Sequence, residues 1–370
     1  MRVAVVGAGA FGRNHLRVYR ELEPVAGVAL AAAVEPDLGR AAETASKYAI
    51  PVFSTVGELL NAGLGLTAAS VAVPTMDHHA VVARLLEAGL DVLVEKPIAA
   101  TLAEADDLIA RAEKTGRILQ PGHLERFNPA VLAIEPRLRR PMFFEAHRLS
   151  VFTPRSLDVD VVLDLMIHDL DIVLTFANSP VREVRAVGLP ILSPKVDIAN
   201  VRVEFESGCV ANFTASRVST ERVRRLRFFE PRQYVSIDYA RQDLLVIRVD
   251  PGAAGGSADV ARNAAAGFEV EKAIAAGKID LEQIAALGGA GLAGLAHPSP
   301  GLSFSKPEVT PGEPLRLEIE AFLDSVRTRR QPRVTARQGR AALALALEIQ
   351  AAMAAHAHRA GLQDFFEPGS

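Results

Sequence analysis

The sequence predicts an α/β protein with an N-terminal doubly wound parallel sheet and a C-terminal α+β domain, whose sheet is large, mainly antiparallel and open-faced. Its 370 residues exceed the length of an average single domain. Strand-like and helical segments alternate over residues 1–120, which is typical of a parallel sheet with right-handed crossovers. Beyond residue 140, strand-like runs follow one another without helices, which favours antiparallel pairing.

The first strand and turn predict a dinucleotide site. The apolar run 3–6 leads into the pattern G-x-G-x-x-G, and a helical segment follows. In such a turn the first glycine allows the tight bend, the second lets a pyrophosphate approach the backbone, and the third lets the helix pack on the strand. The helix N-terminus offers free N–H groups to phosphates. The residues expected to hold the cofactor here are Gly7, Gly9, Ala10, Phe11 and Gly12.

An acidic residue stands at the spacing that such a site requires. Glu35 ends the apolar run 28–34, about 20 residues past the last glycine of the turn. A carboxylate there accepts hydrogen bonds from the ribose hydroxyls and repels a 2′-phosphate. The sequence therefore predicts a Rossmann domain that binds NAD in preference to NADP.

The remaining elements of the first domain continue the alternation. Strands are expected at 2–6, 28–35, 69–73, 91–94 and 117–120, and helices at 12–22, 37–48, 55–62, 78–88 and 102–115. The pattern changes after Pro121 and Gly122. We therefore predict an NAD-binding domain over 1–121 and a substrate-binding and oligomerisation domain over 122–370.

The second domain is predicted to be built on one sheet. A strand is expected at 142–150, a helix at 158–177, and further strands at 182–188, 199–206, 209–216, 225–230, 233–239 and 243–249. Ser207 and Gly208 mark a hairpin turn. A broad sheet face is usually covered, so a homodimer or homotetramer is expected.

Two segments complete the chain. Residues 251–305 form a Gly/Ala-rich insertion with a helical stretch near 258–288, and it is open whether this is a mobile flap or a partner surface. Residues 315–355 are helical in two segments, with a break at Gln331 and Pro332.

Composition restricts the class of protein. A net charge of −3 gives no electrostatic footprint for nucleic acid. Cys209 is the only cysteine, which excludes an intrachain disulfide and a cysteine-based zinc site. No run approaches the ~20 apolar residues of a membrane span, and the N-terminal strand does not resemble a signal peptide. We expect a cytoplasmic protein that acts on a small molecule and not at a membrane.

Two features carry candidate chemistry. Lys96 follows the strand 91–94, at the end where open α/β sheets bind ligands, although a lysine there is often simply solvated. On the predicted helix 158–177, Asp164 stands four residues before His168, so it can contact the imidazole and raise its basicity. This arrangement suits a general base. A surface cluster or a metal-ligand set is the alternative, but no metal is expected, because a nicotinamide already accepts the hydride.

The chain resembles the glucose-fructose oxidoreductase/inositol dehydrogenase (Gfo/Idh/MocA) family. The resemblance is carried by the pattern from Gly7 to His15, by Glu95-Lys96-Pro97 and by Asp164 with His168, and it covers nearly all of the chain apart from roughly 251–305. It implies a Rossmann domain and an α+β domain whose open sheet mediates assembly. It also implies that Lys96 contacts the reacting hydroxyl, with His168 as acid/base and Asp164 nearby.

The same resemblance extends the cofactor site. Family members often carry a strand-end proline followed four residues later by a histidine near the nicotinamide ribose, which is Pro74 to His78 in this sequence. The neighbouring His79 leaves the choice of imidazole open. The residues that the resemblance adds to the NAD site are Pro74, Thr75, His78, Glu95 and Lys96.

Residues 122–129 are similar to family members that act on nucleotide sugars, especially UDP-N-acetylglucosamine 3-dehydrogenases, which make a 3-keto sugar for lipid A assembly. Arginine and asparagine side chains offer donors to sugar hydroxyls or phosphate, although any one arginine can be a solvated surface charge. The expected substrate contacts are Lys96, His123, Arg126, Asn128, Arg148, Arg155, Asp164, His168 and Arg217. The run Arg222, Arg224, Arg225 and Arg227 is interpreted as a solvated strand face or a subunit contact.

The leading hypothesis is an NAD-dependent dehydrogenase that oxidises a hydroxyl, at C3, of a UDP-linked amino sugar. Two alternatives stay open: an inositol or aldose dehydrogenase of the same family, or a non-catalytic NAD-binding regulator.

Overall fold

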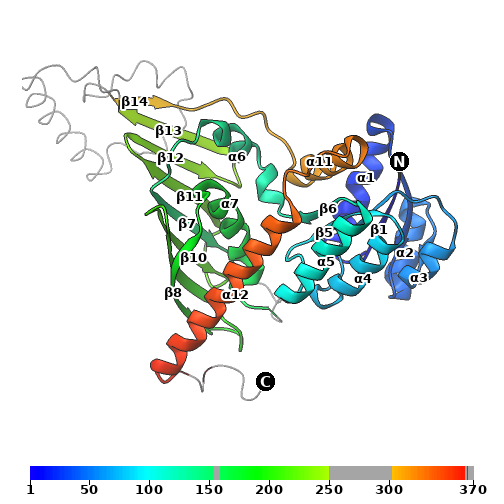
Figure 1. Cartoon of the computed structure of the whole chain (residues 1–370), viewed down its shortest axis with the longest axis horizontal. Helices are drawn as coiled ribbons and strands as arrows, with labels where there is room; N and C mark the ends of the chain where they lie inside the picture. The colour runs from blue at the N-terminus through cyan, green and yellow to red at the C-terminus, as the bar shows by residue number, and fades with distance from the viewer. Residues whose placement is uncertain (153–158, 250–301, 363–364, 366–370) are drawn as a thin grey trace, which may run out of the picture.

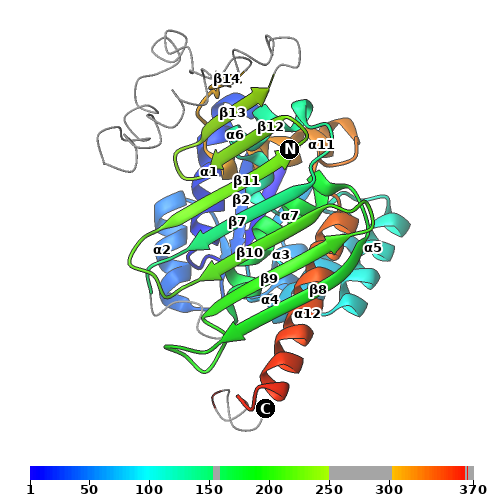
Figure 2. The same ribbon diagram turned by 90° about the vertical axis from the view of Figure 1, so that its left-hand side faces the viewer.

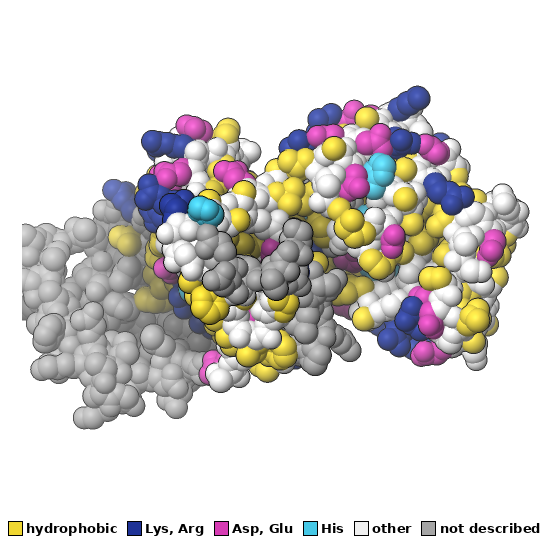
Figure 3. All heavy atoms as spheres, turned by 90° about the horizontal axis from the view of Figure 1, so that it is seen from below, with side chains coloured by type: hydrophobic (Ala, Val, Ile, Leu, Met, Phe, Trp, Pro, Cys, Tyr) yellow, Lys and Arg dark blue, Asp and Glu magenta, His cyan; other side chains and the backbone are white. Residues whose placement is uncertain are grey.

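The computed structural model describes residues 1–152, 159–249, 302–362 and 365. It contains two sheets, each with its own hydrophobic core, and the C-terminal helices run between them (Figure 1). This architecture confirms the predicted fold class. Acidic and basic side chains are interspersed over the lobe of the first sheet in Figure 3, in keeping with the small net charge.

The first sheet has six parallel strands in the order β3-β2-β1-β4-β5-β6. Its strands are β1 (Arg2–Val6), β2 (Ala29–Val34), β3 (Val52–Phe53), β4 (Ala68–Val71), β5 (Asp91–Glu95) and β6 (Leu119–Gly122). The helices between them are α1 (Gly12–Ala26), α2 (Leu38–Tyr48), α3 (Val56–Asn61), α4 (Thr75–Glu87) and α5 (Leu102–Thr115). The strand order reverses between β1 and β4, and this switch point is where open α/β sheets bind ligands.

The predicted strands and helices of this domain are confirmed, although several bounds differ; α1, for example, continues to Ala26 instead of ending at residue 22. The two-residue strand β3 was missed because it is too short to show a hydrophobic period. Helix α4 begins at Thr75, directly after Pro74, rather than at residue 78. Strand β6 was expected at 117–120 but extends to Gly122. Pro121 and Gly122, after which the pattern changes, therefore still belong to the first sheet.

The second sheet has eight strands in the order β14-β13-β12-β11-β7-β10-β9-β8. Neighbours are antiparallel except β7 and β10, which run parallel. Its strands are β7 (Phe143–Leu149), β8 (Val181–Leu189), β9 (Ile198–Phe205), β10 (Val210–Ser216), β11 (Val223–Glu230), β12 (Gln233–Asp238), β13 (Asp243–Val249) and β14 (Leu302–Ser305). Most of the predicted insertion lies outside the described residues, and its last residues form β14, which sequence reasoning missed.

Helices cover one face of this sheet and leave the other open (Figure 2). The covering elements are the 3₁₀ turns η1 (Leu124–Phe127) and η2 (Glu135–Arg137), the helices α6 (Pro129–Ile134) and α7 (Ile167–Ala177), and the π-helical turn η3 (Val162–Met166). Phe144 and Phe228 pack below α7, where Phe176 meets the Phe228 ring edge-on. The strands alternate buried and more exposed positions, as expected for a sheet with one covered face.

The two C-terminal helices, α11 (Pro314–Thr328) and α12 (Ala336–Arg359), join the two sheets. Leu315, Ile319 and Phe322 of α11 belong to the core of the first sheet, while α12 packs against α5, α7 and β8. The predicted break near Pro332 is confirmed, whereas the division of the chain at residue 121 stays a prediction. In the described ranges, no helix combines the length and apolar character needed to cross a membrane.

Helix α11 also carries a buried acid. The side chain of Glu318 is fully buried, and neither carboxyl oxygen makes a hydrogen bond within the described part of the chain. Burial, and then the negative charges of Glu95 and Asp171, raise the pKa of Glu318 well above its ordinary value. The folded protein therefore holds Glu318 as a neutral carboxylic acid.

We expect Glu318→Gln to stabilise the protein at pH 8 and to have much less effect near pH 4. The folded-state pKa of Glu318 lies above its unfolded value, so wild type loses stability as pH rises past the unfolded pKa, by about 1.4 kcal/mol per unit of difference. Thermal unfolding of both proteins from pH 4 to pH 8 measures this. Glu320→Gln, on the same helix and paired with Arg316, is the control. A wild-type minus variant difference that is constant with pH contradicts the assignment.

Candidate active site

The glycines of the first turn have different structural roles. Gly7 has a φ of +92°, and a Cβ there would come within 2.6 Å of the Ala72 carbonyl oxygen. A Cβ on Gly12 would lie 1.7 Å from the Gly7 carbonyl oxygen. A Cβ on Gly9 would meet nothing within 4 Å. The fold thus requires Gly7 and Gly12, while Gly9 borders open space where a pyrophosphate can approach.

The N-terminus of α1 adjoins that space. Phe11 precedes the helix, provides no side-chain cap, and is 48% exposed. The first turn contains no acidic side chain. The Arg13 N–H already donates to the Gly9 carbonyl oxygen, so the main-chain N–H groups that precede Arg13 are the ones left for an anionic ligand.

Glu35 lies against the same turn. Its Oε2 accepts a hydrogen bond from the Ala8 N–H at 3.0 Å, and its Oε1 accepts from Asp37 N at 3.0 Å and Arg40 Nη2 at 2.9 Å. Burial alone raises the pKa of Glu35, but these hydrogen bonds outweigh it, so the pKa lies below its ordinary value. The acid is ionised beside the glycine turn, which fits an NAD site.

The imidazoles after Pro74 point in different directions. His78 is buried, with Nδ1 2.8 Å from the Pro97 carbonyl oxygen and Nε2 3.1 Å from that of Val73. His79 instead lies 2.7 Å from Asp107 of α5. His78 therefore supports the turn that carries Lys96, and Pro74 and Thr75 form the start of α4 beside it.

Glu95 is held against α1, the helix that follows the glycine turn. His15 on α1 and Glu95 at the end of β5 are both buried, and His15 Nε2 lies 2.8 Å from Glu95 Oε1. This contact fixes the end of β5 against α1. Glu95 therefore acts here as an anchor for the adjacent Lys96.

Lys96 extends from the first sheet to the helix of the second. Its Nζ donates to the carbonyl oxygens of Asp164 at 2.6 Å and Leu163 at 3.3 Å, and lies 3.8 Å from Asp164 Oδ1. Residues 162–166 are π-helical, which leaves carbonyls of this turn available, and such turns recur at functional sites. Burial lowers the pKa of Lys96, although Asp164 and then Glu95 oppose this shift.

His168 lies one helical turn beyond Asp164. Its Nδ1 is buried and makes no hydrogen bond among the residues described. Burial, followed by the positive charges of Lys96 and Arg148, lowers the pKa of His168 well below its ordinary value. The imidazole is therefore neutral at pH 7 and can accept a proton.

This corrects one expectation. Asp164 was expected to contact His168 and raise its basicity, on the assumption of a regular α-helix. The π-helical turn shifts the register, so the Asp164 carboxylate pairs with Lys96, and the pKa of His168 falls. Asp171, three residues after His168, is buried, and its Oδ2 lies 3.7 Å from Arg126 Nη1.

Three predicted substrate residues make buried contacts within the protein. Arg148 binds both oxygens of Asp169, at 2.7 and 3.0 Å, and Glu125 at 3.0 Å. Asn128 caps α6 and donates to the Tyr239 carbonyl at 3.0 Å. Arg126 donates to Thr175 Oγ1 at 2.5 Å. These residues connect the segment after β6 to the second sheet.

His123 is close enough to Lys96 and His168 for their charges to interact. It is buried, and both ring nitrogens lack a hydrogen bond in the described ranges. Burial lowers the pKa of His123, although the negative charge of Asp171 opposes this shift. The charge of Lys96 acts on both His123 and His168, so the structure brings these groups together.

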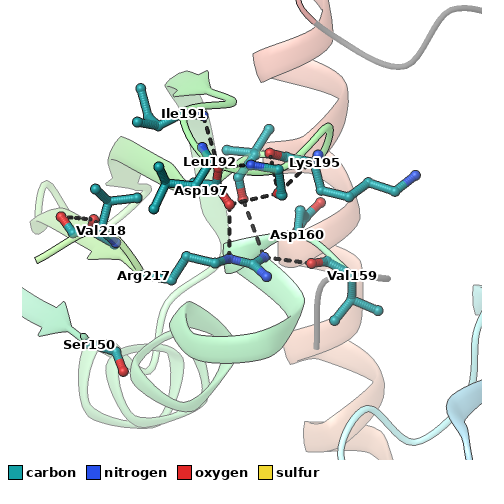
Figure 4. A network of polar contacts seen from close by, with 12 residues as sticks. Ser150, Val159, Asp160, Ile191, Leu192, Lys195, Asp197, Arg217 and Val218 are labelled. Carbon is teal, nitrogen blue, oxygen red and sulfur yellow. Dashed lines mark hydrogen bonds and ion pairs between the residues drawn. The ribbon is translucent and has the colours of Figure 1, made fainter. Parts of the chain in front are cut away.

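Arg217 lies elsewhere. Its Nε is 3.3 Å from Asp197 Oδ1, and Nη2 donates to the Val159 carbonyl at 2.5 Å (Figure 4). Asp197 Oδ2 in turn accepts three main-chain N–H bonds, from Ile191, Leu192 and Ser193. Arg217 thus fixes the loop 190–197 to the residues that precede η3 and α7. Arg155, another of the expected substrate contacts, lies outside the described residues.

The run that contains Arg224 was interpreted as a solvated strand face or a subunit contact. Arg224 is exposed, but it lies on the opposite side of β11 from Arg225 and Arg227. It pairs with Arg148 across the strands, on the helix-covered side of the sheet. Arg224 is two and four residues before the apolar Leu226 and Phe228, so it shares their face of the strand, and this spacing was the signal in the sequence that would have found it.

Comparison with known proteins gives concordant matches. Residues 1–123 match the profile of an oxidoreductase family with an NAD-binding Rossmann fold, and 131–230 match the GFO/IDH/MocA C-terminal domain. The chain is 36% identical over 279 residues to a UDP-N-acetylglucosamine 3-dehydrogenase of Acidithiobacillus ferrooxidans, a match that covers 73% of this chain and 87% of the relative. A solved structure of that enzyme aligns over 96% of this chain and 98% of its own, with 31% identity and a TM-score of 0.78.

More distant matches include a scyllo-inositol 2-dehydrogenase of Bacillus subtilis, 26% identical over 59% of this chain and 68% of the relative. An Agrobacterium radiobacter oxidoreductase, solved with NAD⁺, L-tartaric acid and magnesium, is 15% identical with a TM-score of 0.74 over 96% of each chain, and shows the fold alone.

We expect Gly9→Ala to fold normally but to bind NAD⁺ at least about tenfold more weakly, because the added methyl group meets no protein atom yet enters the space of the pyrophosphate. Titration of NAD⁺ followed by calorimetry, together with thermal unfolding, measures both effects. Gly12→Ala is the contrasting variant, since its clash with Gly7 destabilises the fold itself by about 1–3 kcal/mol or more. Unchanged NAD⁺ affinity in Gly9→Ala argues against this binding geometry.

Proposed function

Because the chain belongs to the Gfo/Idh/MocA family and is an NAD-dependent dehydrogenase, we propose that it oxidises the C3 hydroxyl of a UDP-linked N-acetylated amino sugar such as UDP-N-acetylglucosamine. One observation carries the catalytic assignment: Lys96 of the first sheet lies against the helical turn that carries Asp164, and a neutral His168 follows on the next turn. A cation and a proton acceptor are thereby brought together at the junction of the two sheets.

The roles of the side chains follow from their charges. The Lys96 ammonium, oriented by the Asp164 carbonyl oxygen and carboxylate, donates to the substrate oxygen and stabilises the negative charge that develops there. The imidazole of His168 accepts the hydroxyl proton. When bound, NAD⁺ would supply the acceptor for the hydride of the same carbon, which would become a ketone. Gly9, the start of α1 and Glu35 would hold this cofactor.

The substrate class rests on similarity and on charge. The relative that matches over 87% of its length is named for UDP-N-acetylglucosamine, and the site contains several cations around His168. A 3-keto product would suit a later transamination in lipid A or other cell-envelope glycan synthesis. An inositol is the second candidate, favoured by the match to a scyllo-inositol 2-dehydrogenase.

A regulator that only binds NAD is the weakest alternative. Such a protein has no need for a buried lysine held against a helix beside a neutral histidine. The described geometry of Lys96 and His168 therefore favours turnover.

We further propose that the protein is a homodimer or homotetramer that assembles through the open face of the second sheet. Phe143, Phe229 and Tyr234 form an aromatic group there, with ring centroids 5.5 and 5.1 Å apart. Phe229 is 36% exposed. Partly exposed aromatic side chains are enriched at protein interfaces.

Incubation with NAD⁺ and a panel of UDP-hexosamines, inositols and aldoses tests the activity. We expect NADH formation with a UDP-hexosamine and a product lighter by two hydrogens in the mass spectrum. Turnover of inositols alone supports the second candidate, and tight NAD⁺ binding without turnover of any of these compounds supports a regulator.

Lys96→Met should reduce kcat by on the order of 10²–10³-fold, because one charged donor to the developing oxyanion is removed. NAD⁺ affinity should change little. Lys114→Met, on the exposed end of α5, is the matched control and should be fully active. Substantial turnover by Lys96→Met contradicts the role given to this lysine.

The pH profile of kcat/KM should rise on its acid side with an apparent pKa below 6.5. His168 must be deprotonated to accept a proton, and burial with the nearby cations lowers the pKa of His168, so activity is lost only well below neutrality. His79→Gln, which alters an imidazole paired with Asp107, should leave the profile unchanged. An acid limb centred at pH 7 or above is the opposing result.

A further inference from the structure

Arg224 faces the candidate active site, unlike its neighbours in the arginine run. On β11, Leu226 and Phe228 are fully buried beneath the helices, and Arg224 shares their side of the strand. Its partner across the ladder is Arg148, which is buried on that side.

The alternate residues of β11 face the open side of the sheet and have acidic partners there. Arg225 lies 3.6 Å from Asp238, and Arg227 lies 3.8 Å from Glu145. Arg225 and Arg227, each with an acidic partner, therefore lie on the open face of the sheet, whereas Arg224 lies on the helix-covered face.

The guanidinium of Arg224 makes no hydrogen bond or ion pair with any other described residue, and the main-chain bonds of Arg224 belong to the strand and to Tyr239. The carboxylates that could neutralise it are already engaged, because Asp169 and Glu125 bind Arg148. Arg224 is exposed to solvent, and partial desolvation, followed by the like charge of Arg148, lowers its pKa. The site thus contains a guanidinium whose charge is not compensated by the protein.

The position of this cation relates it to the reaction. The charge of Arg224 acts on the imidazole of His168, the proposed base. In a UDP-hexosamine the diphosphate is attached at C1, two carbons from the hydroxyl at C3. A cation close to the base is therefore where that diphosphate can be bound.

We propose that Arg224 binds the diphosphate of the substrate and thereby selects nucleotide sugars over uncharged polyols. This rests on the proposed function. A guanidinium presents five donors in a planar fork that matches phosphate oxygens in a bidentate arrangement. The phosphate also offsets the repulsion between Arg224 and Arg148.

Calorimetric titration of UDP into the NAD⁺-loaded protein tests this without requiring turnover. Arg224→Gln should weaken UDP binding at least tenfold, and raised salt should weaken the binding of UDP to wild type more than to the variant. Uridine, which has no phosphate, should bind both proteins equally. Arg227→Gln changes the same residue type on the same strand but on the opposite face, and should bind UDP as wild type does.

Two results overturn the proposal. The first is that wild type and Arg224→Gln bind UDP with equal affinity, or that neither binds it. The second is that the substitution weakens the binding of UDP and of uridine by the same factor. Kinetics then separate this inference from the proposed function. If UDP-N-acetylglucosamine is oxidised and Arg224→Gln leaves its KM unchanged, the Arg224 assignment alone fails. If UDP binding depends on Arg224 but no UDP-hexosamine is oxidised, the proposed function alone fails.

Discussion

The contact of the Lys96 ammonium with the carbonyl oxygens of residues 163 and 164 is the interaction on which the site depends. It joins the end of β5 in the first sheet to the first turn of the helix that carries His168. Taking a lysine out of water is costly unless it is paired and hydrogen-bonded. Here two carbonyl oxygens and one carboxylate compensate the charge, and the same groups determine where the ammonium can point.

Buried polar contacts on both sides hold this lysine and its helix in place. His15 fixes Glu95, the residue before Lys96, against α1. On the other side, Asp160 caps the first turn and is bound by Gln350 of α12, while Arg217 holds the Val159 carbonyl. Such residues lie outside the reacting centre, yet their geometry limits how far Lys96 and His168 can separate. This explains why Arg217, although buried and charged, need not touch a substrate.

The parts of the site that sequence could predict are those determined by local geometry. A glycine turn and an acid after the next strand depend only on short-range spacing, so Gly7, Gly12 and Glu35 could be placed in advance. The partners of Arg148 and Arg217 could not, because Asp169 and Asp197 are brought to them by strand pairing and helix packing. Hydrophobic periodicity does not reveal a π-helical turn. The side-chain directions of Asp164 and His168 were therefore predicted from regular α-helical geometry, which does not apply to residues 162–166. By contrast, the sequence was sufficient to predict which residues of β11 share a face. This alternation was overlooked because the run contains several arginines.

The charge balance of the site links substrate binding to proton transfer. Burial, and then the charges of Lys96, Arg148 and Arg224, lower the pKa of His168, which leaves the imidazole neutral but a weak base. A bound diphosphate would offset part of this positive field and raise the basicity of His168 once the substrate is present. An uncharged polyol would not have this effect. The same excess of positive charge can therefore favour an anionic substrate at the binding step and improve the base at the chemical step, without any movement of the backbone.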